Sequence, residues 1–100
     1  MDKTKEKIYR LLMWDYDISP EEVDKLVKGE TEFAGHYDIN NLFRKMLESF
    51  PWFTIIKLFE INTIAELLTD QIINKLRTQS LRKTYFYVKK RLHEIIPAAR

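Results

Sequence analysis

The stretch from 50 to 61, Phe-Pro-Trp-Phe-Thr-Ile-Ile-Lys-Leu-Phe-Glu-Ile, constrains the fold more than any other part of the chain. After the proline it holds seven large apolar residues, and its polar exceptions, Thr54, Lys57 and Glu60, recur every three residues. On a helix these exceptions would form one narrow polar stripe, which reverses the pattern of a surface helix. Proline suits the first turn, where its missing N–H is no loss. We therefore predict a buried central helix over residues 51–60.

Helix-start and helix-stop signals organise the chain before this stretch. The sequence Ser-Pro-Glu-Glu at 19–22 predicts a capping box with proline in the first helical position. Gly29 can end that helix, because glycine adopts a positive φ at little cost. Asp38 is predicted to cap a helix over 39–49, whose apolar residues repeat with helical spacing. A first helix is expected over residues 4–14.

The chain after this stretch carries further helix signals. Thr63 opens a second capping box, for a helix that runs to Leu76 with a break at 69–70. Ser80 is predicted to cap the last helix. The residues expected to be buried on that helix are Leu81, Tyr85, Val88, Leu92 and Ile95. We therefore predict an all-α fold: a single helical domain over residues 1–100, arranged as a compact orthogonal array of five to six short helices around the buried central helix.

The composition argues against most catalytic chemistry. Without cysteine there are no disulfides, thiolate metal sites or thiol nucleophiles. His36 and His93 lie far apart in the sequence, and no glycine-rich loop is present to hold a phosphate. Asp15 and Asp17 are assigned to a turn, because nothing makes them converge with other oxygen ligands on a metal. We expect no enzyme activity, no cofactor, no metal and no small-molecule substrate.

The hydropathy of the sequence gives an expectation for its cellular location. No apolar run approaches the roughly 18 residues that a membrane span needs, and the charged start is not followed by the apolar core of a signal peptide. We therefore expect a cytoplasmic protein with no membrane association.

Charge is distributed unevenly along the sequence. Residues 1–50 carry 8 Lys/Arg against 11 Asp/Glu, whereas residues 51–100 carry 9 against 4. The candidate nucleic-acid-binding residues on or beside the last helix are Arg77, Arg82, Lys83, Tyr87, Lys90 and Arg91. A basic helix face of this kind could lie along a phosphate backbone and displace counterions. The alternative is a solvated helix face whose lysines only keep the protein soluble.

Aromatic residues supply the second candidate surface. The chain holds 13% aromatic residues, and Trp14 and Tyr16 fall outside the regular apolar stripes. Tryptophan and tyrosine are common anchors of protein interfaces, so these two are our candidate partner-binding residues. The alternative is that they close the end of a small core.

Two segments carry a resemblance to a known family. The sequence Leu-Met-Trp-Asp-Tyr-Asp at 12–17 and the sequence Phe-Arg-Lys-Met-Leu-Glu at 43–48 resemble a family of small uncharacterised bacterial helical proteins. Ser49-Phe50-Pro51 stands where that family usually has a glycine. Genes of the family often lie beside nucleotidyltransferase-type toxins of abortive-infection systems. The resemblance implies an antitoxin-like or regulatory partner and no catalytic residues.

These observations lead to two functional hypotheses. The first is a non-enzymatic protein-interaction module, with a protein partner such as a toxin. The alternative is a DNA-binding protein that uses its basic C-terminal helix.

Overall fold

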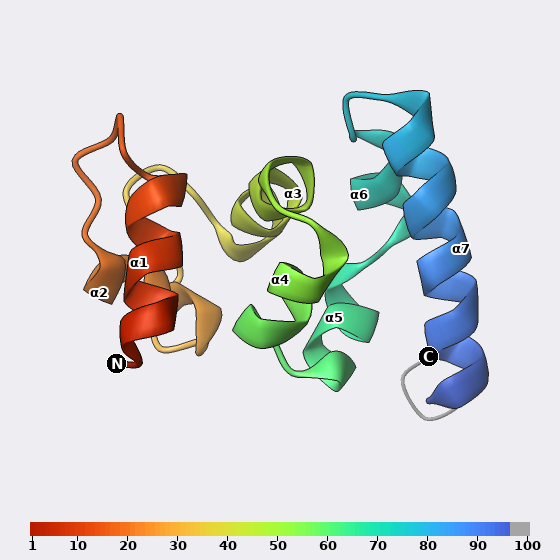
Figure 1. Cartoon of the computed structure of the whole chain (residues 1–100), viewed down its shortest axis with the longest axis horizontal. Coiled ribbons are helices and arrows are strands. Elements are labelled where there is room, and N and C mark those ends of the chain that lie inside the picture. The colour runs from red at the N-terminus through yellow and green to blue at the C-terminus, as the bar shows by residue number, and fades with distance from the viewer. Residues whose placement is uncertain (97–100) are drawn as a thin grey trace. The chain divides into compact units, whose positions relative to one another are not determined.

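The computed structural model describes residues 1–96, which form seven helices and no strand (Figure 1). The helices are α1 (Lys3–Leu12), α2 (Pro20–Val27), α3 (Ile39–Ser49), α4 (Trp52–Leu58), α5 (Ile61–Leu67), α6 (Asp70–Asn74) and α7 (Gln79–Ile95). The prediction of an all-α fold is confirmed, with one helix more than expected. None of these helices combines the length and the apolar character needed to cross a bilayer.

Two compact units divide the chain, the first from Met1 to Leu42 and the second from Phe43 onward. By sequence, the first unit carries 6 Lys/Arg and 10 Asp/Glu, a net charge of −4, and the second carries 11 and 5, a net charge of +6. The prediction of a single domain over residues 1–100 stays a prediction, and so do the central helix and the orthogonal arrangement.

The first unit begins and ends its helices with the caps that the sequence indicates. Asp2 caps α1 by accepting a hydrogen bond from the Thr4 N–H. Both halves of the predicted capping box between Ser19 and Glu22 form at the start of α2. Gly29 follows that helix with a φ of 78°. The helix start at Asp38 is also confirmed, since its carboxylate accepts from the Asn41 N–H at 2.8 Å.

A buried tyrosine marks the core of the first unit. The other buried apolar residues there are Leu12, Met13, Val23, Leu26, Ala34 and Leu42. Tyr9 is fully buried, and its hydroxyl has no hydrogen-bond partner among the described residues. Burial raises the pKa of Tyr9 to about 12, and the Asp24 carboxylate adds to the shift. Asp24 is itself nearly buried and pairs with Lys28, whose Nζ lies 2.9 Å from a carboxylate oxygen.

The second unit packs its core from all the helices that it contains. Its fully or nearly buried residues include Phe43, Met46, Leu47, Ile55, Leu58, Phe59, Ile64, Leu68, Ile73, Leu76, Tyr85 and Leu92. Phe43 and Phe59 meet edge to face, with ring centroids 5.4 Å apart. Trp52 packs on Tyr85 in a similar geometry at 6.4 Å, which connects α4 with α7.

The predicted burial of the stretch at 50–61 is wrong for three of its apolar residues. Phe53 is 62% exposed, and Ile56 and Ile61 are exposed as well. The prediction assumed one continuous helix, but α4 has only seven residues and the chain turns extended at Phe59. A break there changes the direction in which later side chains point, so one polar stripe no longer describes the stretch.

Two predicted caps after this stretch are also wrong, and a third signal is confirmed. α5 begins at Ile61, so Thr63 lies inside its first turn and caps nothing. Thr78 takes the place predicted for Ser80, because its hydroxyl accepts from the Leu81 N–H at 3.1 Å. The break at 69–70 is real, since Thr69 caps the separate helix α6. On α7, Tyr85 and Leu92 are buried as predicted, Leu81 and Val88 are half-buried, and Ile95 is exposed.

Candidate functional site

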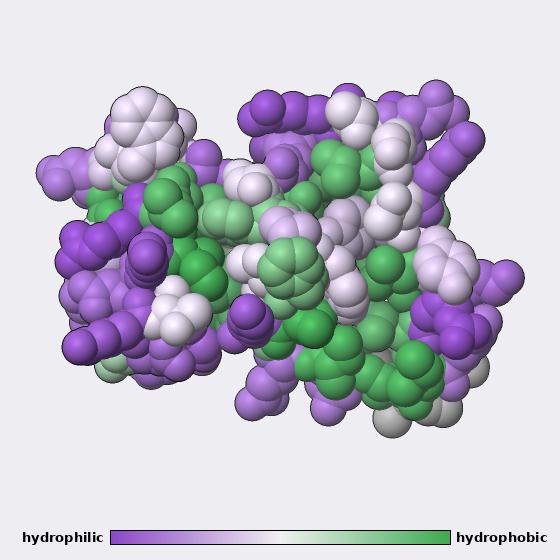
Figure 2. All heavy atoms as spheres, in the orientation of Figure 1, coloured by the Kyte–Doolittle hydropathy of each residue, from purple (hydrophilic) through white to green (hydrophobic). Residues whose placement is uncertain are grey.

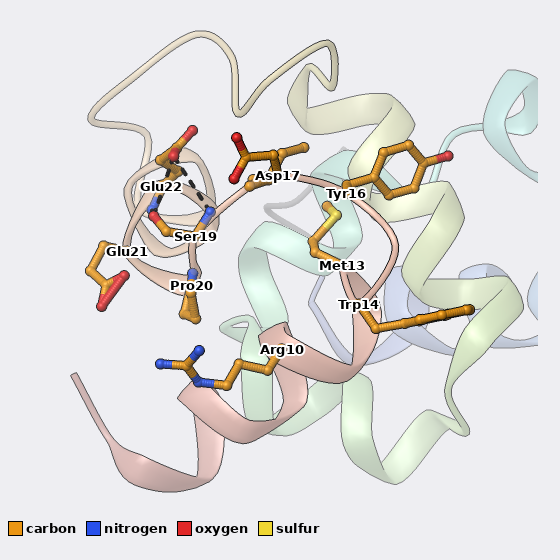
Figure 3. Close-up of a pocket in the computed structure, with 10 residues that line it drawn as sticks. Arg10, Met13, Trp14, Tyr16, Asp17, Ser19, Pro20, Glu21 and Glu22 are labelled. Atoms are coloured by element: carbon orange, nitrogen blue, oxygen red, sulfur yellow. Dashed lines mark hydrogen bonds between the residues drawn. The ribbon is translucent and has the colours of Figure 1, made fainter.

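Trp14 and Tyr16 lie in the bend that follows α1, and both reach the surface. The Tyr16 N–H donates to the Met13 carbonyl oxygen at 3.0 Å, which closes a tight turn over the buried Met13 side chain. Trp14 is 81% exposed, so it does not close the end of the core. Figure 3 shows both rings projecting to one side of the bend, away from Glu21 at the start of α2.

A second loop of the first unit brings two more rings to Tyr16. The Tyr16 ring lies 5.4 Å from the His36 ring and 5.8 Å from the Tyr37 ring, and His36 lies 4.2 Å from Tyr37. We call Trp14, Tyr16, His36 and Tyr37 the aromatic loop surface. It joins two segments that are about twenty residues apart in the sequence.

The backbone holds the second loop in one conformation. Ala34 and Tyr37 exchange two backbone hydrogen bonds of 2.9 and 3.0 Å. Gly35 between them has a φ of 60°, which glycine adopts easily, and a Cβ there would lie only 2.6 Å from Ile18 Cδ1. The Ile18 side chain thus packs against the turn that carries His36 and Tyr37. The rings stand on an ordered framework, and such frameworks lower the entropy cost of binding.

A shallow hollow of about 410 Å³ lies beside this surface, between the end of α1 and the start of α2 (Figure 3). Its lining residues are Arg10, Met13, Trp14, Tyr16, Asp17, Ile18, Ser19, Pro20, Glu21 and Glu22. Two of its charged groups already have partners. Arg10 pairs with Glu6 at 2.8 Å, and Glu22 is used in the capping box. Within residues 1–96, no group of three or more His, Asp or Glu side chains is placed to hold a metal ion.

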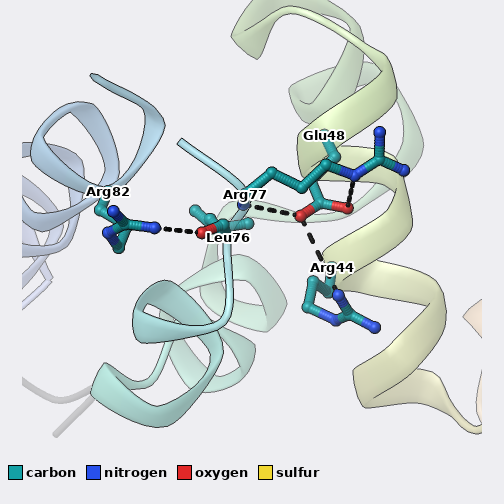
Figure 4. A network of polar contacts seen from close by, with 5 residues as sticks. All are labelled: Arg44, Glu48, Leu76, Arg77 and Arg82. Atoms are coloured by element: carbon teal, nitrogen blue, oxygen red, sulfur yellow. Dashed lines mark hydrogen bonds and ion pairs between the residues drawn. The ribbon is translucent and has the colours of Figure 1, made fainter. Parts of the chain in front are cut away.

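The candidate nucleic-acid residues are all in the second unit, and three of them have partners within it. Figure 4 shows two of the three, Arg77 and Arg82. The side chain of Glu48 is only 7% exposed, and its carboxylate accepts from the Arg77 backbone N–H at 3.0 Å. The Arg77 Nε lies 3.4 Å from the same carboxylate. Arg82 donates to the Leu76 carbonyl oxygen, and Arg91 pairs with Glu94 at 3.0 Å. The contacts of Arg77 and Arg82 lie at the start of α7, whereas the pair of Arg91 and Glu94 lies near its end. All three arginines therefore have partners other than phosphate.

Three other candidate residues on α7 remain free to contact a phosphate. Lys83, Tyr87 and Lys90 are exposed, and none of them has a hydrogen bond or ion pair among the described residues. Their spacing of four and three residues places them on one face of the helix.

The second unit also carries an apolar surface that sequence reasoning missed. Phe53, Ile56 and Ile61 are exposed on α4 and at the start of α5. Figure 2 shows hydrophobic side chains gathered over this part of the unit. The ammonium group of Lys57 lies 5.8 Å from the Phe53 ring centroid, within range of a cation–π contact.

Comparison of the chain with protein-family models, curated proteins and solved structures found no match. The family resemblance of residues 12–17 and 43–48 therefore stays an expectation, and the functional argument below depends on the surfaces just described.

Proposed function

We propose that this protein is a non-enzymatic interaction module that binds a protein partner through the aromatic loop surface. The observation that carries the proposal is the 81% exposure of Trp14 on an ordered turn. A large indole left in water is unfavourable by itself and becomes favourable when a partner buries it. Tryptophan and tyrosine at the centre of an interface commonly contribute about 2 kcal/mol or more each.

The family resemblance suggests which partner to test. An antitoxin-like or regulatory role, exerted in the cytoplasm on a toxin encoded nearby, is the form of this function that we propose to test first. In such a role the protein needs a binding surface and no catalytic residues.

Replacing both Trp14 and Tyr16 by alanine should reduce partner capture at least about tenfold, because two interface anchors are lost. Helix content should change little, since both residues lie outside the helices. The melting temperature should fall only modestly, because Trp14 is exposed and Tyr16 loses its ring contacts with His36 and Tyr37. The measurement is capture of the neighbouring gene product, or of proteins from the native lysate, on immobilised protein, with circular dichroism as the check on folding. Phe53→Ala is the control, because it removes another exposed aromatic side chain, one that belongs to the other unit. Equal capture by the double variant and the native protein would contradict the proposal.

DNA binding through α7 is the second candidate function. It is favoured by the exposure of Lys83, Tyr87 and Lys90 on one helix face in a unit of net charge +6. Because the nearby arginines are held by carboxylates and a carbonyl, Lys83 and Lys90 are the two groups expected to reach phosphates.

Two phosphate contacts predict a specific salt dependence. The logarithm of the duplex affinity should fall with the logarithm of salt concentration at a slope near −1.8. Charge reversal by Lys83→Glu and Lys90→Glu should remove most of that slope without unfolding the protein. Reversal of Lys3 and Lys7, which are exposed in the first unit, is the control and should leave the slope nearly unchanged. Absence of binding to any duplex at about 50 mM salt and micromolar protein would rule this candidate out.

A further inference from the structure

The bend that carries Trp14 and Tyr16 also carries two carboxylates, of which Asp17 points toward the start of α2 (Figure 3). Asp15 and Asp17 alternate with its rings along the bend, in the order Trp-Asp-Tyr-Asp. Both are exposed, and neither forms an ion pair or hydrogen bond among the described residues. They carry two negative charges on the segment that holds the exposed indole.

The cations of the first unit are too few to neutralise its acidic groups. Arg10, the nearest cation before the bend, is paired with Glu6. Lys25, the nearest cation after it, is exposed and has no ion pair among the described residues. The unit as a whole has a net charge of −4. A partner that approaches the rings therefore meets a negative field, which accelerates and favours the docking of a positive surface.

We infer that the aromatic loop surface accepts an arginine-rich basic segment of its protein partner. A guanidinium group can stack on the exposed Trp14 indole, and further arginines of the same segment can pair with the exposed carboxylates of Asp15 and Asp17 in the bend. Lysine supplies the charge but neither the planar stacking nor the bidentate geometry. This inference rests on the proposed function, because it names the chemistry of the partner at the same surface.

The test uses the full chain and three fluorescein-labelled nine-residue peptides, in which glycine alternates with arginine, lysine or glutamate. Fluorescence anisotropy should show the arginine peptide binding about threefold or more tightly than the lysine peptide, and no binding of the glutamate peptide. The variant with Asp15→Asn and Asp17→Asn should bind the arginine peptide about tenfold more weakly. Trp14→Ala should weaken it about threefold or more.

A charge-matched control separates this surface from the general field of the unit. Glu30→Gln together with Glu32→Gln removes the same charge from exposed positions that do not line the hollow beside the rings. This control should retain most of the affinity, and a loss as large as that of the Asp15 and Asp17 variant would overturn the inference.

Equal binding of the arginine and glutamate peptides would also overturn the inference, and so would no binding of the arginine peptide at about 50 mM salt. If alanine at Trp14 and Tyr16 still abolished partner capture in that case, the proposed function would stand and the partner would have a different chemistry.

Salt-sensitive self-association, seen by sedimentation equilibrium and lost in the Asp15 and Asp17 variant, would overturn the inference as well. In that case the occupant is a second copy of this chain, whose second unit is basic.

Discussion

Phe43→Ala is expected to lower the free energy of unfolding by about 3–5 kcal/mol, the usual cost of deleting a buried aromatic side chain. Phe43 is fully buried and packs edge to face on Phe59, so the change removes both burial and the ring contact. A protein of this size has a total stability of about 5–15 kcal/mol, so the second unit should be close to unfolding at room temperature. Urea titration followed by circular dichroism measures the loss.

Phe53→Ala provides the comparison with identical chemistry at an exposed site. Phe53 lies on α4, in the stretch that the sequence indicated as the centre of the core, but it is 62% exposed. Its replacement should cost within about 0.5 kcal/mol, as is usual for surface positions. If the two variants lost equal stability, the exposed face of α4 would have to be buried in solution.

Tyr9 should make the protein lose stability in strong alkali. Its pKa is raised to about 12 in the folded state, against about 10 in an unfolded chain. The folded state therefore binds more protons than the unfolded state between these values, so stability is fully present below pH 10 and falls as the pH rises towards 12. Two pKa units correspond to about 2–3 kcal/mol. Unfolding free energies measured by urea titration from pH 8 to 12 test this expectation.

Tyr9→Phe isolates this contribution from the other groups that titrate in alkali. The variant keeps the ring and removes only a hydroxyl that is buried without a hydrogen-bond partner among the described residues. Near neutral pH it should be as stable as the native protein or slightly more so, because an unpaired buried polar group is unfavourable. At pH 12 it should exceed the native protein by about 2–3 kcal/mol. Parallel loss of stability in both proteins would show that Tyr9 is hydrated in the folded state.

The sequence predicted helix boundaries correctly where a few neighbouring residues determine them. The capping box of Ser19 and Glu22, the positive φ of Gly29 and the cap at Asp38 each depend on residues only a few positions apart. The exposure of Phe53 and Ile56 could not be predicted in this way. It depends on where α4 ends, and a short helix is set by tertiary packing more than by its own pattern.

The candidate site shows the same limit of local reasoning. Trp14 and Tyr16 were predictable because they fall outside the apolar stripes. The addition of His36 and Tyr37 depends on a loop closure about twenty residues away, for which Gly35 is the only local signal. Likewise, Glu48 lies 29 residues before Arg77, and no spacing rule pairs them.

The position of the boundary between the units has a consequence for the evolution of the chain. Leu42 and Phe43 flank it, both are fully buried, and both belong to the uninterrupted helix α3. A genetic crossover between these codons would join two helix halves whose hydrogen bonds span the join, together with two core residues selected in different backgrounds. Exchange of the aromatic loop surface between related genes is therefore expected to succeed when the crossover falls after Tyr37 and before α3, so that all four rings move together. Partner recognition could then change while the helix that both units share is inherited whole.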